Sequence, residues 1–372
     1  MTSYADFTST AADRIRAASA AGTPLRIRGG GSKDFYGQAL VGDILDTTAL
    51  NGIVSYEPSE LVVTALAGTP LAELEAQLAA QGQCLPFEPP HFSPGATVGG
   101  MVASGLSGPA RASVGAVRDY VLGVKLINGK GEHLTFGGQV MKNVAGYDMS
   151  RLMVGAMGTL GLLTEVSLKV LPIAPLEATL KFEMTQAEAL SQLNTWGGQP
   201  LPLNASCWLE EAGVGTLYLR LRGALAAVEA ACAKLDGQRL PNNQAAADLA
   251  LCRNQQLPWF TARSDTQDLW RLSVPQTAPV LDLPNSPLIE WHGGQRWVLV
   301  DSTDAEQGQR LRELAASVGG SATLFIAARA YKQGALPRFD TLKSPLDRIH
   351  RDLKREFDPS GVFNPHRMHT DW

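Results

Sequence analysis

Residues 94–105, PGATVGGMVASG, constrain the fold more than any other stretch of this sequence, because four glycines and no charged residue fall within twelve positions. Glycine and alanine add little side-chain contact to a core, and they recur where a backbone must come very close to another backbone or to a ligand. The stretch therefore predicts a close approach, and the partner is either protein or a bound molecule.

Two further segments are rich in glycine, and each lies beside a strand-like run. The first, RIRGGGSKDFYG at residues 26–37, places three consecutive glycines before Ser32 and Lys33. Successive N–H groups in such a loop converge on an anion, and the Ser32 hydroxyl suits a phosphate oxygen. The alternative is a flexible turn between two elements. The second, GAMGTLGLLTEVSLKVLP at residues 155–172, has its glycines directly before an alternating strand.

The familiar nucleotide motifs are absent, since the sequence contains neither GxxxxGK[ST] nor GxGxxG. Three glycine-rich loops, each next to a strand, could instead enclose one extended ligand. That ligand would have a pyrophosphate at one end and a flat ring further on. The combination is more specific than any one of the loops.

Composition excludes several classes of protein. The 372 residues suggest two domains, and 32 Lys and Arg against 36 Asp and Glu leave no basic excess for nucleic acid. No apolar run reaches the roughly 18 residues of a membrane span, and the charged first residues do not resemble a signal peptide. The four cysteines form no CxxC pair, which argues against an iron–sulfur or zinc site and favours reduced thiols in a cytoplasmic protein.

The pattern of elements changes along the chain. Short strand-like and helical runs alternate in the first part, which indicates a layered domain, and Asn128-Gly129 predicts a type I′ hairpin turn. From about residue 173 the order is strand, helix, two strands and helix. A similar order over residues 270–329 suggests an internal repeat and a mainly antiparallel sheet backed by helices.

A last helix is predicted after Ser344, which would cap it. Its apolar stripe consists of Leu346, Ile349, Leu353 and Phe357. The other face is basic and carries Arg348, His350, Arg351, Lys354 and Arg355. We interpret these charges as a solvated face, with a lipid or partner surface as the alternative.

The order of these motifs resembles the FAD-linked oxidase superfamily with the vanillyl-alcohol-oxidase-type (PCMH-type) FAD fold. The motifs are RGGGSKDFYG, PGATVGGMVASGLSGP, SVGAVRDYVLGVKLINGKGE, MKNVAGYDMSRLMVGAMGTLGLLTEVSLKV and FDPSGVFNP. Within it the chain is most similar to the GlcE subunit family of glycolate oxidase. The resemblance is strong over residues 25–172 and 344–366 and weak between them.

The resemblance implies an α+β fold. A two-subdomain PCMH-type FAD-binding domain would occupy residues 1–172, and a smaller cap domain, with a mainly antiparallel sheet backed by helices, residues 173–343. Residues 344–372 would form a helix and tail that return to the FAD-binding domain.

It also assigns cofactor contacts. Those to the FAD pyrophosphate are Gly29, Gly30, Gly31, Ser32 and Lys33. Those beside the isoalloxazine and ribityl chain, where a large side chain would collide with the cofactor, are Pro94, Gly95, Thr97, Gly99, Gly100, Ser104 and Gly105. Those near the adenine end are Gly158, Thr159, Gly161 and Leu163, and Asn364 would reach back toward the flavin. Asp119 matches an acidic residue of the family, with a cap or turn role equally open.

A further family segment, KNVAGYD, includes Lys142, Asn143, Tyr147 and Asp148, which would lie near the ligand or brace a loop. The flavin would be held noncovalently, because relatives that link FAD through a histidine carry it within the first glycine-rich loop, which here has Ser32 and Lys33.

Relatives that oxidise D-2-hydroxy acids have a metal-binding HxxxxxxH pair and a later acidic-histidine segment, and this chain has neither. We therefore expect no metal site, and His292 is the only histidine of the second domain. Arg271 and Arg329 are the catalytic candidates, because an arginine can bind a carboxylate with two parallel hydrogen bonds. The alternative for each is a surface or packing role.

By resemblance, the chain would be an FAD-binding subunit of a glycolate oxidase that converts glycolate to glyoxylate. Its partners would be a homologous FAD-binding catalytic subunit and an iron–sulfur subunit. The location would be cytoplasmic, with attachment to the inner face of a membrane only through the complex. Two alternatives stay open: a self-sufficient FAD-dependent D-2-hydroxy-acid dehydrogenase, and a scaffold subunit without a redox role.

Overall fold

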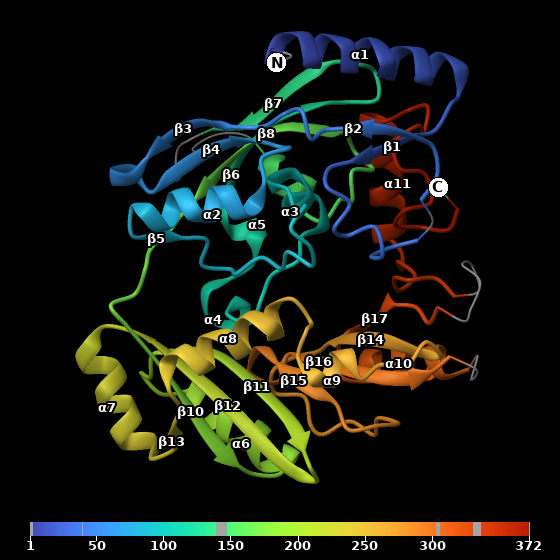
Figure 1. Ribbon diagram of the computed structural model, residues 1–372. Helices are drawn as coiled ribbons and strands as arrows, with labels where there is room; N and C mark the ends of the chain where they lie inside the picture. Colours follow the sequence, from blue (N-terminus) through green and yellow to red (C-terminus); the bar gives the residue numbers. More distant parts are fainter. Residues whose placement is uncertain (1–2, 39, 139–146, 303–305, 330–335, 372) are drawn as a thin grey trace. The chain divides into compact units, whose positions relative to one another are not determined.

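The computed structural model describes residues 3–38, 40–138, 147–302, 306–329 and 336–371 (Figure 1). The chain divides into two compact units. The first unit comprises Met1–Leu106, Ala116–Ile173 and Thr341–Trp372, and the second comprises Ser107–Gly115 and Ala174–Asp340.

The first unit is built on a five-stranded antiparallel sheet. Its helices are α1 (Tyr4–Ala21), α2 (Leu71–Ala80), α3 (Val98–Ser104), α5 (Val117–Tyr120) and α11 (Leu346–Phe357), with short 3-10 turns η1 (Pro58–Glu60) and η2 (Ser150–Met153). Its strands are β1 (Leu25–Arg28), β2 (Asp43–Asp46), β3 (Ile53–Glu57), β4 (Val62–Leu66), β5 (Gln83–Cys84), β6 (Val121–Ile127), β7 (His133–Gly137), β8 (Leu162–Lys169) and β9 (Leu171–Pro172). The sheet order is β3-β4-β8-β6-β7, while β1 and β2 form a separate parallel pair and β5 and β9 an antiparallel one.

Helices cover both faces of this sheet (Figure 1). On one face, α2 buries Leu71, Leu74 and Leu78 completely against the sheet and α3, as a stripe of spacing three and four requires. On the other, α1 packs near Ile127 of β6 and Leu162 of β8. Successive strand residues point to opposite faces, so adjacent positions of β6 and β8 can serve the two layers.

The second unit is an eight-stranded antiparallel sheet with helices. Its helices are α4 (Arg111–Val114), α6 (Gln186–Gly197), α7 (Leu225–Leu235), α8 (Asn242–Arg253), α9 (Pro258–Thr261) and α10 (Gln307–Ser317), with the 3-10 turn η3 (Trp291–Gly293). Its strands are β10 (Leu176–Glu183), β11 (Leu203–Glu211), β12 (Val214–Gly223), β13 (Gln238–Arg239), β14 (Gln267–Ser273), β15 (Leu288–Glu290), β16 (Gln295–Asp301) and β17 (Ser321–Ile326).

The order of this sheet, β13-β10-β12-β11-β15-β16-β14-β17, shows an internal repeat. Each half has four strands, β10–β13 and β14–β17, counted in chain order. From the outer edge of the sheet toward its middle, each half has its fourth, first, third and second strand. The halves meet where Cys207 and Trp208 of β11 pair with Glu290 and Ile289 of β15. The predicted repeat and antiparallel sheet are confirmed, although the first half has α6 after its first strand whereas residues 274–287 of the second half form no helix.

The predicted two-residue hairpin turn is wrong. Ile127 pairs with His133, so five residues lie between the strands. The Asn128 side chain accepts hydrogen bonds from the N–H groups of Lys130 (3.0 Å) and Glu132 (2.9 Å). The Gly129 N–H donates to the carbonyl of Phe357. Local and tertiary hydrogen bonds therefore favour a longer loop.

The last helix also departs from its prediction. Ser344 does not cap α11, which begins after Pro345 without a side-chain cap. Within the predicted apolar stripe, Leu346 and Ile349 are exposed and Phe357 is buried. Lys354, expected on a solvated face, is instead buried. Within the described part of the chain, every helix is too short or too polar to span a bilayer.

Candidate cofactor site

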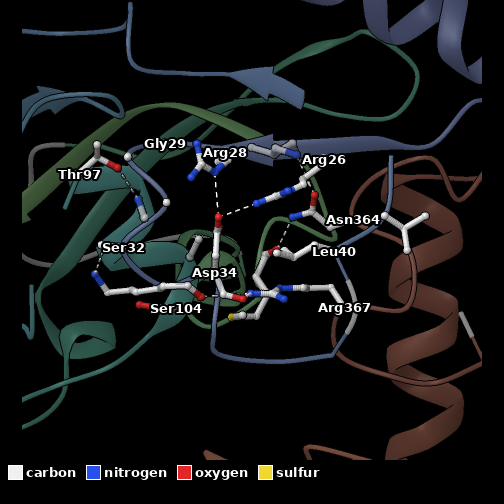
Figure 2. Close-up of a pocket in the computed structure, with 18 residues that line it drawn as sticks. Arg26, Arg28, Gly29, Ser32, Asp34, Leu40, Thr97, Ser104, Asn364 and Arg367 are labelled. Atoms are coloured by element: carbon white, nitrogen blue, oxygen red, sulfur yellow. Dashed lines mark hydrogen bonds and ion pairs between the residues drawn. The ribbon is translucent and has the colours of Figure 1, made fainter. Parts of the chain in front are cut away.

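The three glycine-rich segments come together around a cavity in the first unit. It consists of two adjoining hollows of about 90 and 70 Å³. Both are lined by Ile27 and Gly29 at the end of β1, by Gly100 and Ala103 of α3, and by Met157 and Asn364. Segments far apart in the sequence thus form one site (Figure 2).

The first loop presents a row of N–H groups at this cavity. Residues 29–33 line it, and none of their backbone N–H groups has a hydrogen-bond acceptor within the described portion of the protein. Gly31 has a φ of 72°, a left-handed conformation that lets successive N–H groups converge. Such a row can receive the oxygens of an anion.

The charges at the same loop are mostly positive. Arg26 and Arg28 both bind one carboxylate oxygen of Asp34, at 2.5 and 2.9 Å (Figure 2). Arg367 donates to the carbonyls of Lys33 (3.1 Å), Asp34 (3.1 Å) and Gln38 (2.7 Å). The lining of the first hollow therefore includes three arginines and one carboxylate.

Lys33 adds a fourth cation. Its ammonium group donates to the Ser32 hydroxyl at 3.2 Å and lies 5.6 Å from the centre of the Phe92 ring. The residue is 9% exposed, and burial lowers the pKa of Lys33 to about 8. An anion in the cavity would stabilise the charged amine, so the donor set fits a diphosphate.

The glycines of residues 94–105 serve two purposes. A Cβ on Gly30 would lie 1.6 Å from the Gly95 carbonyl oxygen, and one on Gly99 would lie 2.8 Å from the Cβ of Ala67. Packing against neighbouring protein atoms therefore already requires a small residue at Gly30 and at Gly99. For Gly99 this requirement adds to the predicted collision with the cofactor. Gly100 differs, because the nearest atom to its added Cβ is the Thr97 hydroxyl at 3.1 Å.

Thirteen of the predicted FAD contacts line the cavity: Gly29, Gly30, Gly31, Ser32, Lys33, Thr97, Gly99, Gly100, Ser104, Gly158, Gly161, Leu163 and Asn364. Five do not: Pro94, Gly95, Gly105, Asp119 and Thr159. Asp119 is exposed and accepts the Ala116 N–H at 2.8 Å, so it caps α5.

Asn364 braces the cavity with both atoms of its amide. Its nitrogen donates to the Met157 carbonyl at 2.6 Å, and its oxygen accepts the Ile27 N–H at 2.8 Å. It therefore joins β1 to the third glycine-rich segment, besides lining both hollows.

Sequence reasoning missed several residues of the site. They are Arg26, Arg28, Asp34, Ala103, Met157 and Arg367. The arginines and Asp34 lie within or beside quoted motifs, and their charges were a usable signal. Arg367 reaches the first loop only through tertiary structure, which no local pattern could show.

The other candidates lie elsewhere. Arg329 is largely exposed and lies 3.5 Å from Asp265, and the Arg271 guanidinium lies 5.4 Å from the centre of the Phe325 ring. Both belong to the second unit. Asp148 accepts the Ser150 hydroxyl at 2.7 Å, and Tyr147 is exposed. The predicted pair Lys142 and Asn143 lies outside the described residues.

His292 occupies a polar contact inside the second unit. Its ring nitrogens lie 3.0 Å from the Ser113 hydroxyl and 3.1 Å from that of Ser206. Burial lowers the pKa of His292 to about 4, so the ring is neutral near pH 7. Within the described ranges, no three His, Cys, Asp or Glu side chains are grouped to hold a metal.

Comparisons with known proteins identify the family of the chain. Residues 4–137 match the family described as FAD binding domain. The chain is 44% identical over 366 residues to glycolate oxidase subunit GlcE of Escherichia coli (strain K12), covering 98% of each chain. It is 30% identical over 143 residues to glycolate oxidase subunit GlcD of Bacillus subtilis (strain 168), covering 38% of this chain and 30% of that one.

Among solved structures, p-cresol methylhydroxylase with substrate bound resembles the whole chain. The TM-score is 0.67 at 14% sequence identity, with 100% of this chain and 88% of that chain covered. At this identity the likeness concerns the fold, which is of the PCMH type and confirms the α+β prediction.

Proposed function

Because the chain belongs to the family of GlcE subunits of glycolate oxidase, we propose that it is an FAD-binding subunit of a complex that oxidises glycolate to glyoxylate. The observation that carries the FAD assignment is the row of five N–H groups that have no acceptor among the described residues, beside Lys33 and three arginines. Bound FAD supplies two-electron redox chemistry, and this chain's residues hold and orient it.

Different residues of the cavity would contact different parts of FAD. The N–H groups of residues 29–33 and the Lys33 amine would hold the pyrophosphate. Gly100 and Ala103 of α3 would lie beside the rest of the cofactor, where their small side chains leave room. Attachment would be noncovalent, since the first loop carries Ser32 and Lys33 and no histidine.

We assign the main substrate site to a homologous FAD-binding subunit, with an iron–sulfur subunit as electron acceptor. This chain lacks the paired histidines of D-2-hydroxy-acid oxidising relatives. Arg329 is too exposed to desolvate a substrate carboxylate by itself. The subunit would be cytoplasmic and would meet a membrane only through the complex.

A spectrum tests the FAD assignment. Purified chain should show flavin absorbance, and acid precipitation should release the flavin into the supernatant. A preparation that stays colourless after addition of FAD would rule out FAD binding. Flavin that remains with the precipitate would instead contradict noncovalent attachment.

Filling the cavity tests where FAD binds. Ala103→Leu should abolish binding, because the added atoms enter a space that both hollows share. Ala76→Leu is the matched control, since Ala76 is exposed on α2. Full binding by Ala103→Leu, measured by quenching of flavin fluorescence, would place the cofactor elsewhere.

Co-purification tests the complex. A tagged copy, expressed in the organism that naturally produces the protein, should co-purify with a second flavin subunit and an iron–sulfur subunit. Glycolate-dependent dye reduction should require all three. Reduction of bound flavin by glycolate in the isolated chain would favour the self-sufficient dehydrogenase. Full activity of a complex containing Ala103→Leu without FAD would favour the scaffold.

A further inference from the structure

We propose that Lys354, which lies outside the cavity, is a positioning residue that turns the third glycine-rich segment toward FAD. The inference rests on the proposed FAD binding. It concerns residues 157–161, four of which line the second hollow: Met157, Gly158, Leu160 and Gly161. The remaining one, Thr159, contacts Lys354.

Lys354 is buried, and all three of its ammonium hydrogens have acceptors. It donates to the Thr159 carbonyl (2.8 Å), to the Asp358 carboxylate (2.6 Å) and to the Phe363 carbonyl (2.9 Å). One side chain of α11 thus connects the third segment to the tail.

The contact with Thr159 sets the direction of the next peptide. The Thr159–Leu160 bond is trans, so its N–H points away from its carbonyl. Because Lys354 holds that carbonyl, the Leu160 N–H faces the opposite side. Neither the Leu160 nor the Gly161 N–H has an acceptor in the part of the protein that the structure describes. Both are available to a ligand in the second hollow.

The segment needs such a restraint, because its backbone is strained. Met157 has a φ of 53° and Gly158 a φ of 73°. A left-handed conformation is unfavourable for a residue with a side chain, such as Met157, and persists only where neighbours fix it. Asn364 holds the Met157 carbonyl and Lys354 holds the Thr159 carbonyl, so the strained Met157 and the left-handed Gly158 lie between two side-chain donors.

Asp358 keeps Lys354 in place. Its carboxylate is buried and also accepts the N–H groups of Val362 (3.1 Å) and Phe363 (2.8 Å). Burial lowers the pKa of Lys354, and Asp358 opposes that effect. Removing only the lysine would leave a buried carboxylate without its cation, so the informative variant changes both residues.

The test is the FAD affinity of the Lys354→Met, Asp358→Asn double variant. We expect at least a tenfold higher Kd for FAD, by titration of the apoprotein and quenching of flavin fluorescence. Phe357→Leu is the matched control on the same helix, because it removes core volume without touching Thr159. It should lower the Tm and leave the Kd unchanged.

Two results would overturn the inference. One is a Kd for FAD in the double variant that equals the wild-type Kd. The other is a Phe357→Leu variant that loses as much affinity for FAD as the double variant when both have lost the same amount of Tm.

If the double variant does not fold, hydrogen exchange in the wild-type protein decides. FAD should slow exchange at Leu160 and Gly161, and no change there would also overturn the inference. Wild-type protein that binds no FAD would overturn the proposed function as well.

Discussion

Single residues at the cavity differ in how far their chemistry follows from their type. Lys33 was predicted as a phosphate contact, and the structure adds that it is buried beside a hydroxyl and an aromatic ring. Burial disfavours the charged amine and lowers the pKa of Lys33 to about 8. An anion reverses this effect, so binding and protonation are coupled.

We expect FAD affinity to depend on pH through Lys33. A bound phosphate raises the pKa of Lys33 above 8, so affinity is highest below pH 8 and falls as pH rises through that value. The affinity for FAD can fall by at most about tenfold for each unit of pH. Titrations of the apoprotein at pH 7, 8 and 9 measure it. Lys33→Met should bind more weakly at pH 7 and lose the dependence. An unchanged profile in that variant would assign the effect to another group.

His292 predicts a second pH effect, on stability. Its pKa is lower in the folded protein, about 4, than the ordinary value near 6.5, so the unfolded chain binds the proton more tightly. The contribution to stability is therefore complete above pH 6.5 and is lost as pH falls toward 4. The loss is up to about 3 kcal/mol.

Denaturant unfolding between pH 7 and pH 4 checks this expectation. His292→Asn should flatten the dependence, because asparagine does not titrate and tolerates the φ of 55° at this position. Equal slopes in the two proteins would show that His292 is not the responsible group.

Residues also show where prediction from sequence fails. The glycine-rich loops and Ser32 follow from local patterns, because their chemistry is local. Asn364 follows only from the family resemblance, since both of its amide partners are distant in the chain. The amphipathic pattern predicts a solvated charge at Lys354. It cannot show that the Asp358 carboxylate and the carbonyls of Thr159 and Phe363 surround the ammonium group. The Asn128-Gly129 dipeptide likewise predicts a two-residue turn, because a local pattern cannot show the hydrogen bonds of Asn128 within a longer loop.

At the scale of elements, the two halves of the second sheet bury one face in different ways. The first half uses α6, whereas residues 274–287 of the second half cover β14 and β16 without a helix. Leu281 is buried there and Leu283 packs against the same cluster. Arg296 fixes this segment, because it is fully buried and donates to the carbonyls of Ala278 (2.8 Å) and Pro279 (2.6 Å).

Arg296→Leu should therefore destabilise the second unit. The buried Ala278 and the more exposed Pro279 lose the donors to their carbonyls, at a cost of roughly 1 to 3 kcal/mol in the free energy of unfolding. Urea unfolding measures the change, and Arg310→Leu, at an exposed position of α10, is the control. Similar midpoints for Arg296→Leu and wild type would mean that Leu281 and Leu283 suffice to hold the segment.

The sequence pattern predicted these strands and their repeat because alternation and turn residues are local signals. It did not predict their pairing across the seam between β11 and β15. That pairing depends on contacts between residues more than 80 positions apart in the chain, for which one sequence carries no periodic signal.

At the scale of the whole molecule, each unit is assembled from separate stretches of chain. Residues 341–372 belong to the first unit, although residues 174–340 intervene. The stretch of residues 341–372 supplies Asn364 and Arg367 to the cavity and Lys354 of α11 to the third glycine-rich segment. A continuous FAD-binding domain ending near residue 172 would therefore lack part of its site.

A fragment of residues 1–172 should bind FAD at least a hundredfold more weakly than the full chain, if it folds. Loss of the Asn364 and Arg367 hydrogen bonds frees both the first loop and the third segment. Adding a peptide of residues 341–372 in trans should restore part of the affinity. Binding by the fragment equal to that of the full chain would show the tail to be dispensable.

The bond between the Ile27 N–H and Asn364 joins positions 337 residues apart. During translation the first loop therefore emerges long before the residues that complete it. The N–H groups of this loop therefore lack the contacts of residues 364 and 367 until the whole second unit has been synthesised. We expect cofactor loading to follow synthesis of residue 367, so that the supply of FAD acts on finished chains and not on nascent ones.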